Sequence, residues 1–124
     1  MPFDKSAAAQ YADIHAESQS TGNCARYVRL AVEAGGISLH HAHFAKDYGP
    51  LLEAMGFRET SLAPQQGDVV VIQPAPGHPA GHMAIFDGSI WVSDFKQTHP
   101  GPQGFYPGPA YRQAHPTYKT YRYN

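Results

Sequence analysis

The chain has little of several features that would assign it to a definite class of protein. It holds one cysteine in 124 residues, so an internal disulfide is excluded. Nine basic residues nearly balance ten acidic ones, and the net charge of −1 gives no general footprint for nucleic acid or an anionic membrane. No apolar run approaches the ~20 residues that span a bilayer, and the first residues lack a signal-peptide core. We therefore expect a chain made in the cytoplasm without a signal peptide, with no membrane insertion and no nucleic-acid partner.

The length of the chain indicates one domain over residues 1–124. Eight histidines, eight tyrosines and eleven prolines are unusual counts, and they favour a loop-rich domain with a groove over a helix bundle. Residues 98–117 are rich in proline, glycine, histidine and aromatic side chains without a repeat. We expect this segment to be an ordered surface loop.

Three helices are expected in the first half of the chain. Asp4 is a suitable N-cap for a helix over residues 5–18. A second helix begins at Cys24 and ends near residue 34, where two glycines supply a stop. Pro50 suits the first turn of a short third helix that ends at Gly56.

The second half of the chain has the patterns of strands. Residues 68–72 form a β-branched run typical of a strand covered on both faces. Residues 82–86 and 90–95, separated by a turn with Gly88, indicate a hairpin. Residues 118–123 are expected to add an edge strand. Helices followed by an antiparallel sheet predict an α+β domain.

The lone cysteine lies where a helix is expected to start. Unpaired backbone N–H groups and the helix dipole at that end favour a negative charge, so we expect the pKa of the Cys24 thiol to fall below its reference value of about 8.5. Cys24 is then a candidate nucleophile. The alternative is a small buried hydrophobe, which is the commoner role of a lone cysteine.

A cysteine nucleophile needs a base and a polar group that orients the base. His82 opens a predicted strand directly after Gly81, which allows a substrate to approach closely. A three-residue loop over residues 87–89 would set His82 opposite Asp94, within reach of a carboxylate–imidazole contact. We therefore predict Asp94 as the orienting residue, the alternative being a solvated carboxylate on a strand.

The other histidines have simpler interpretations. His40, His41 and His43 share one loop without a further ligand cluster, so a zinc site is a weak hypothesis and no metal or other cofactor is predicted. The histidines beside prolines are expected to be solvated, and His15 to pack on the first helix.

Four motifs in order match a known superfamily. They are Gly22-Asn23-Cys24-Ala25-Arg26-Tyr27-Val28, Gln66-Gly67-Asp68-Val69-Val70-Val71-Ile72, Gly81-His82-Met83-Ala84-Ile85-Phe86 and Trp91-Val92-Ser93-Asp94-Phe95. Together they resemble the cysteine, histidine-dependent amidohydrolase/peptidase (CHAP) and NlpC-type superfamily, and within it the small amidase effectors of bacterial type VI secretion. The match covers residues 20–97.

The resemblance implies a papain-like fold, with the nucleophile helix packed on a small antiparallel sheet, and hydrolysis of amide bonds in peptidoglycan stem peptides. Carried over by position, Cys24 is the nucleophile, His82 the base and Asp94 the orienting residue. It also implies export to the target-cell periplasm and an inhibitory immunity protein. Two alternatives stay open, a cytosolic cysteine protease of the same fold and a non-catalytic binding module.

The substrate contacts are less defined. The Cys24 backbone N–H is expected to hold the oxyanion, with a second group from residues 19–23, for which Gln19 and Asn23 are the candidates. Tyr27 and Arg26 lie one turn along the helix and are candidates for contacting the substrate, although packing on the helix face is an equal alternative for Tyr27.

Overall fold

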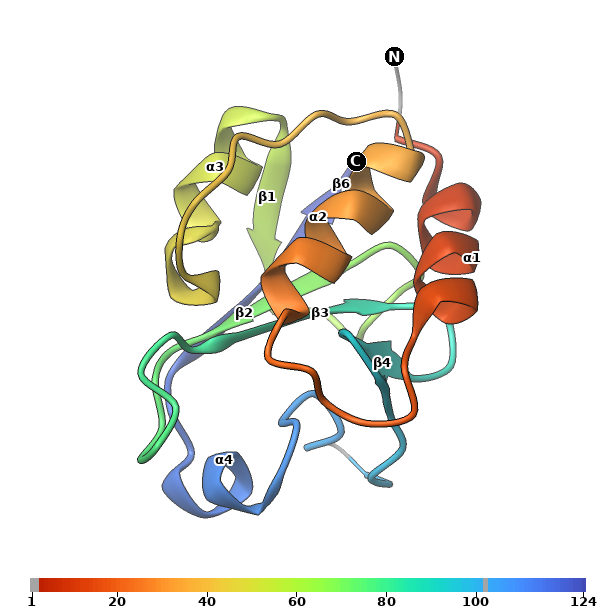
Figure 1. Ribbon diagram of the computed structural model, residues 1–124. Coiled ribbons are helices and arrows are strands. Elements are labelled where there is room, and N and C mark those ends of the chain that lie inside the picture. Colours follow the sequence, from red (N-terminus) through yellow and green to blue (C-terminus); the bar gives the residue numbers. More distant parts are fainter. Residues whose placement is uncertain (1–2, 102) are drawn as a thin grey trace.

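The structure, a computed structural model, describes residues 3–101 and 103–124 and has a six-stranded sheet in the order β1-β6-β2-β3-β4-β5. Neighbouring strands are antiparallel throughout. Helices α1 and α2 lie side by side over one face of the sheet, and α4 lies away from them (Figure 1). The elements are α1 Lys5–His15, α2 Cys24–Ala34, the 3-10 turn η1 Ala45–Asp47, α3 Gly49–Ala54, β1 Phe57–Thr60, β2 Val69–Ile72, β3 His82–Phe86, β4 Trp91–Val92, β5 Lys96–Gln97, α4 Pro109–Ala114 and β6 Tyr118–Tyr123.

Helix α1 starts as predicted but ends early. The Asp4 side chain caps it by accepting a hydrogen bond from the Ala7 backbone N–H at 2.9 Å. It ends at His15 and not at residue 18, because the next residues are extended and Glu17 forms a bridge with Phe95. Through this bridge, the segment before Cys24 lies against Phe95, next to the edge strand β5.

Strand β2 is buried along its whole length, which confirms the prediction of a strand covered on both faces. The prediction of an edge position for residues 118–123 is wrong, since β6 lies between β1 and β2. No sequence pattern predicts β1, a four-residue strand with two exposed polar side chains in its middle. Its pairing with β6 moves β6 into the interior of the sheet.

The two faces of the sheet have separate apolar clusters. The larger one lies between the sheet and the helices and includes Val28, Ala31 and Val32 of α2. The smaller one contains Trp91 and is covered by Tyr106 and Tyr111. Residues 98–117 are therefore not only a surface loop as expected: they contain α4 and bury two tyrosines against the sheet.

The hairpin register differs from the prediction. Phe86 pairs with Trp91 and not with Ile90, so the loop has four residues, 87–90. The cause is the Asp87 side chain, which accepts hydrogen bonds from the backbone N–H groups of Ser89 and Ile90, both at 2.8 Å. This Asx turn takes one residue more than the expected loop. His82 is consequently not opposite Asp94.

None of the helices within residues 3–101 and 103–124 is both long and apolar enough to cross a bilayer.

Candidate active site

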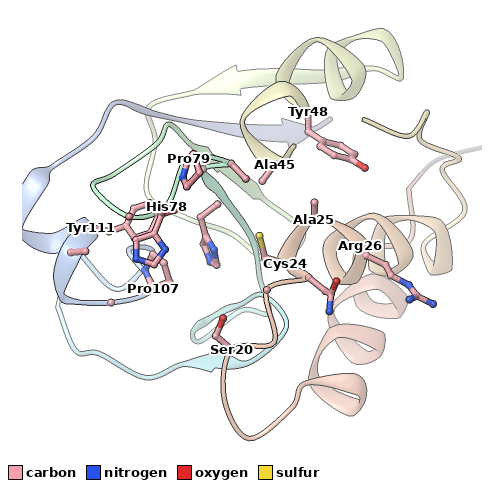
Figure 2. A pocket seen from close by; sticks show the side chains of 18 of the residues that line it. Ser20, Cys24, Ala25, Arg26, Ala45, Tyr48, His78, Pro79, Pro107 and Tyr111 are labelled. Atoms are coloured by element: carbon pink, nitrogen blue, oxygen red, sulfur yellow. The ribbon is translucent and has the colours of Figure 1, made fainter. Parts of the chain in front are cut away.

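A pocket of about 820 Å³ opens at the N-terminus of α2, and both Cys24 and His82 line it. Its walls come from the turn before α2 and from residues 41–48, 77–81 and 107–111. Figure 2 shows the Cys24 sulfur in the middle of this pocket, with His78 and Tyr111 on one side and Tyr48 on the other. The predicted nucleophile Cys24 and the predicted base His82 are 58 positions apart in the sequence, and the fold brings both to one cavity.

Cys24 is the first residue of α2, and its thiol is largely enclosed. Burial raises the pKa of the Cys24 thiol to about 11, and the Asp94 charge acts in the same direction, while a hydrogen bond with the Met83 backbone opposes them. The expectation of a lowered pKa is therefore wrong, because desolvation outweighs the helix N-terminus. That hydrogen bond also places the sulfur against the residue that follows His82.

His82 opens β3 and is 6% exposed. Gly81 before it has a φ of +73°, and a Cβ there would collide with the carbonyl oxygen of Ile72, so the chain needs glycine at this point. Burial lowers the pKa of His82 to about 4, against the opposing effects of the hydrogen bond with Gln97 and the Asp94 charge. Thiol and imidazole are thus both neutral at rest.

The group bonded to the imidazole is Gln97, a residue that the sequence patterns do not identify. His82 Nε2 lies 2.7 Å from Gln97 Oε1, and Gln97 Nε2 donates to the carbonyl oxygens of Gly104 at 3.1 Å and Phe105 at 2.8 Å. Carbonyls only accept, so these two bonds fix which end of the amide faces the histidine. His82 Nε2 must then carry the proton, which leaves Nδ1 as the proton acceptor.

Asp94 is fully buried but does not hydrogen-bond to His82. Its Oδ2 accepts from the Thr21 backbone N–H at 2.6 Å, the Thr21 hydroxyl at 2.8 Å and the Asn23 backbone N–H at 3.3 Å. The predicted contact between Asp94 and His82 is absent because the longer hairpin loop shifts the register. Asp94 instead fixes the turn that leads into Cys24.

Comparison with known proteins identifies the family of this chain. The CHAP domain family matches residues 14–95. The chain belongs to the CHAP domain family. Gln97 lies two positions beyond the matched segment, whereas Cys24, His82 and Asp94 lie within it. The α+β, papain-like fold expected for a CHAP domain is confirmed.

Two solved structures resemble this CHAP domain along nearly its whole length. One is the native type VI effector–immunity complex Tae3–Tai3 from Ralstonia pickettii, with a TM-score of 0.94, 61% identity, and coverage of 98% of this chain and 100% of the other. The other is the selenomethionine form of the same complex, with a TM-score of 0.88, 63% identity, and coverage of 93% and 98%. A search of curated proteins gave no match.

Of the four residues predicted to contact the oxyanion or substrate, two, Asn23 and Arg26, line the pocket of this CHAP domain. Asn23 is exposed there, and its amide donates to the Thr21 backbone oxygen at 3.3 Å and the Thr21 hydroxyl at 3.2 Å. Gln19 is exposed outside the pocket. Tyr27 also lies outside it and donates its hydroxyl to Glu17 at 2.7 Å. The structure therefore supports neither Gln19 nor Tyr27 as a substrate contact.

The histidines of the loop before η1 do not form a metal centre. Within residues 3–101 and 103–124, no group of three histidine, cysteine, aspartate or glutamate side chains could hold a metal ion. His41 and His43 line the pocket, and His15 stacks on Tyr11 with ring centroids 3.8 Å apart. The last contact agrees with the expected packing on the first helix.

The role of Asp94 in the CHAP domain predicts a pH-dependent stability. Burial alone would raise the pKa of Asp94, but its hydrogen bonds from Thr21 and Asn23 hold it below its usual value. Its stabilising effect is therefore complete above the unfolded pKa of about 4 and is lost as the pH falls through the lower folded pKa. We expect Asp94→Asn to lower the free energy of unfolding by about 1–2 kcal/mol at neutral pH.

Urea unfolding from about pH 5 to about pH 2 measures this effect. The loss of stability across that range should be smaller for Asp94→Asn than for the wild type. Asp47→Asn is the control, since Asp47 is an exposed carboxylate whose ion pair with Lys46 is 3.4 Å long. Equal losses in Asp94→Asn and wild type would contradict the assigned role of Asp94.

Proposed function

We propose that this CHAP domain is a cysteine-dependent peptidoglycan amidase, an endopeptidase that hydrolyses amide bonds of stem peptides as an antibacterial type VI effector. The observation that carries the proposal is the pairing of Cys24 and His82 in one pocket, with the imidazole oriented by Gln97. Identity of 61% to a type VI effector across 98% of the chain supports the biological setting.

The proposed reaction begins with proton transfer from Cys24 to His82. As the substrate displaces water from the pocket, His82 Nδ1 takes the proton of Cys24 Sγ, and the thiolate attacks the carbonyl carbon of the scissile amide. The backbone N–H of Cys24, unpaired at the start of α2, stabilises the oxyanion. The imidazolium then gives its proton to the leaving amine, and the C–N bond breaks.

The second half of the reaction restores the enzyme. A water molecule gives a proton to His82 Nδ1 and attacks the thioester carbonyl. The carboxylic acid product leaves, and the proton returns from His82 to Cys24. Gln97 keeps the imidazole in the tautomer that both halves require, because its own amide orientation is fixed by two carbonyls.

The relatives also suggest where the enzyme acts and what inhibits it. Both were solved as effector–immunity complexes. By similarity, the protein is secreted into the periplasm of a target cell, where peptidoglycan lies, and an immunity protein inhibits it in the producing lineage.

Incubation with purified sacculi tests the proposed function. Wild type should release soluble stem-peptide fragments, and their masses identify the bond that is cut. Cys24→Ala, which removes only the sulfur, should release none. The proposal fails if wild type releases no fragments, or if Cys24→Ala releases as many. Digestion of protein substrates without digestion of muropeptides would instead indicate a general cysteine protease.

A further inference from the structure

The lining of the catalytic pocket has charge of one sign only. The chain as a whole has ten acidic and nine basic residues. Among the residues that line the pocket in the described part of the chain, one is an arginine, four are histidines and none is an aspartate or glutamate. Asp94 lies near the cysteine but is fully buried beneath the turn, and its Oδ2 is bonded to that turn. A ligand in this pocket therefore meets the Arg26 cation and the hydrogen-bonding groups of the histidines without an opposing exposed carboxylate.

Arg26 supplies the permanent charge of that lining. It is exposed and lies two residues after Cys24 in α2. The ion pairs found across residues 3–101 and 103–124 do not include it, whereas Arg29 on the same helix pairs with Glu33 at 3.3 Å. Arg26 thus contributes to the lining of the pocket, with a side chain that extends away from Cys24 (Figure 2) and a guanidinium that the protein itself does not neutralise.

The position of Arg26 divides the pocket into two unlike ends. In Figure 2, Arg26 and Tyr48 lie on one side of Cys24, while Pro107, Tyr111 and His78 lie on the other. The second end is aromatic and proline-lined, with the His78 and Tyr111 rings 5.1 Å apart. A peptide bound across Cys24 would have its charged end beside Arg26 and a less polar portion at the Tyr111 end.

We propose that Arg26 binds a free carboxylate of the peptide substrate and thereby selects carboxylate-bearing stem peptides over amidated ones. A guanidinium is planar and can bind a carboxylate through two parallel hydrogen bonds, which gives geometric selectivity as well as affinity. Stem peptides of peptidoglycan contain such carboxylates, on side chains and at chain ends. The assignment rests on the proposed function, because it names the chemical group by which that substrate is recognised.

Binding to an inactive protein tests the proposal without turnover. The Cys24→Ala protein is titrated by calorimetry with two muropeptides of the same sequence, one with free carboxyl groups and one with amidated carboxyl groups. We expect tighter binding of the free form. Adding Arg26→Gln should weaken binding of the free form by about tenfold, the lower end for a charge-assisted hydrogen bond, and leave the amidated form unchanged.

Two further variants control for charge and folding. Arg26→Lys keeps the positive charge and should retain part of the preference for the free form. Arg58→Gln removes an exposed arginine that does not line the pocket, and it should change neither affinity. The proposal is overturned if Arg26→Gln leaves binding of the free form unchanged, or weakens both forms equally.

Kinetics of the active protein separate this proposal from the proposed function. If wild type hydrolyses both muropeptides and Arg26→Gln raises KM only for the free form, both hold. If wild type hydrolyses both muropeptides and Arg26→Gln changes KM for neither of them, the amidase function stands and the carboxylate assignment fails. If wild type hydrolyses neither form, the proposed function fails, and the carboxylate assignment fails with it.

Discussion

We expect His82→Ala to lower kcat/KM for muropeptide hydrolysis by about 10⁴-fold, the upper range for loss of a general base. The physical reason is the buried thiol. Since burial raises the pKa of Cys24 to about 11, about one thiol in 10⁴ is ionised at pH 7 without a base. Wild type avoids this limitation because His82, neutral at rest, accepts the proton when the substrate is bound.

The pH dependence distinguishes loss of the base from loss of the fold. In His82→Ala only solvent can deprotonate Cys24, so its residual activity and its alkylation rate with iodoacetamide should rise about tenfold per pH unit below the thiol pKa. Cys24→Ala should show no such rise. A His82→Ala protein that hydrolyses muropeptides at neutral pH as fast as wild type would show that His82 does not act on the thiol.

Gln97→Leu provides a graded version of the same experiment. Gln97 does not line the pocket, so its loss should lower kcat by about 10²-fold, within the range for acid–base catalysis, with KM unchanged. Gln103→Leu is the matched control, because it removes a nearby amide whose hydrogen bond is with His115 at 3.3 Å and not with His82. Equal kcat values for the two variants would argue against Gln97 as the group that positions His82.

The sequence predicts those features of the site that depend on residues adjacent in the chain. The cap at Asp4, the cysteine at the start of α2 and the histidine after Gly81 depend on neighbouring residues, and all three were placed correctly. The third group was not, because it depends on register. The Asp87 side chain adds one residue to the hairpin loop, and the chain then turns at Ser93, whose N–H donates to the Phe95 oxygen at 3.0 Å, before β5 presents Gln97.

Residues 98–117 also depend on contacts with distant residues that local sequence patterns do not predict. Proline, glycine and aromatic side chains without a period predicted a surface loop, since no local signal tells a solvated tyrosine from a buried one. What buries these tyrosines is a non-local contact, because Tyr106 and Tyr111 cover the apolar face of β2 and β3 that the first two helices leave free and so remove it from water. The same segment provides the carbonyls of Gly104 and Phe105 that orient Gln97, so its packing also contributes to the site.

The largest effect on stability is expected at a buried ion pair away from the pocket. Arg122 of β6 donates to Asp68 from Nε at 2.9 Å and from a terminal nitrogen at 2.8 Å, and it also donates to the Ala63 oxygen at 2.8 Å. The Asp68 side chain is fully buried and that of Arg122 is 9% exposed. Arg122→Met would leave the carboxylate buried without its partner, so we expect the free energy of unfolding to fall by about 3–5 kcal/mol.

Denaturant unfolding measures this loss, and the chain offers a matched surface pair. Lys119 of β6 and Glu59 of β1 form an exposed contact of 3.8 Å, and Glu59→Gln should change stability by less than about 1 kcal/mol. The double variant Asp68→Leu, Arg122→Met should recover part of the loss, because it removes both charges together. Recovery should stay incomplete, since the Gln65 N–H, which donates to Asp68 at 2.9 Å, and the Ala63 oxygen would lose their partners. A double variant less stable than Arg122→Met alone would show that the pair matters for packing more than for charge.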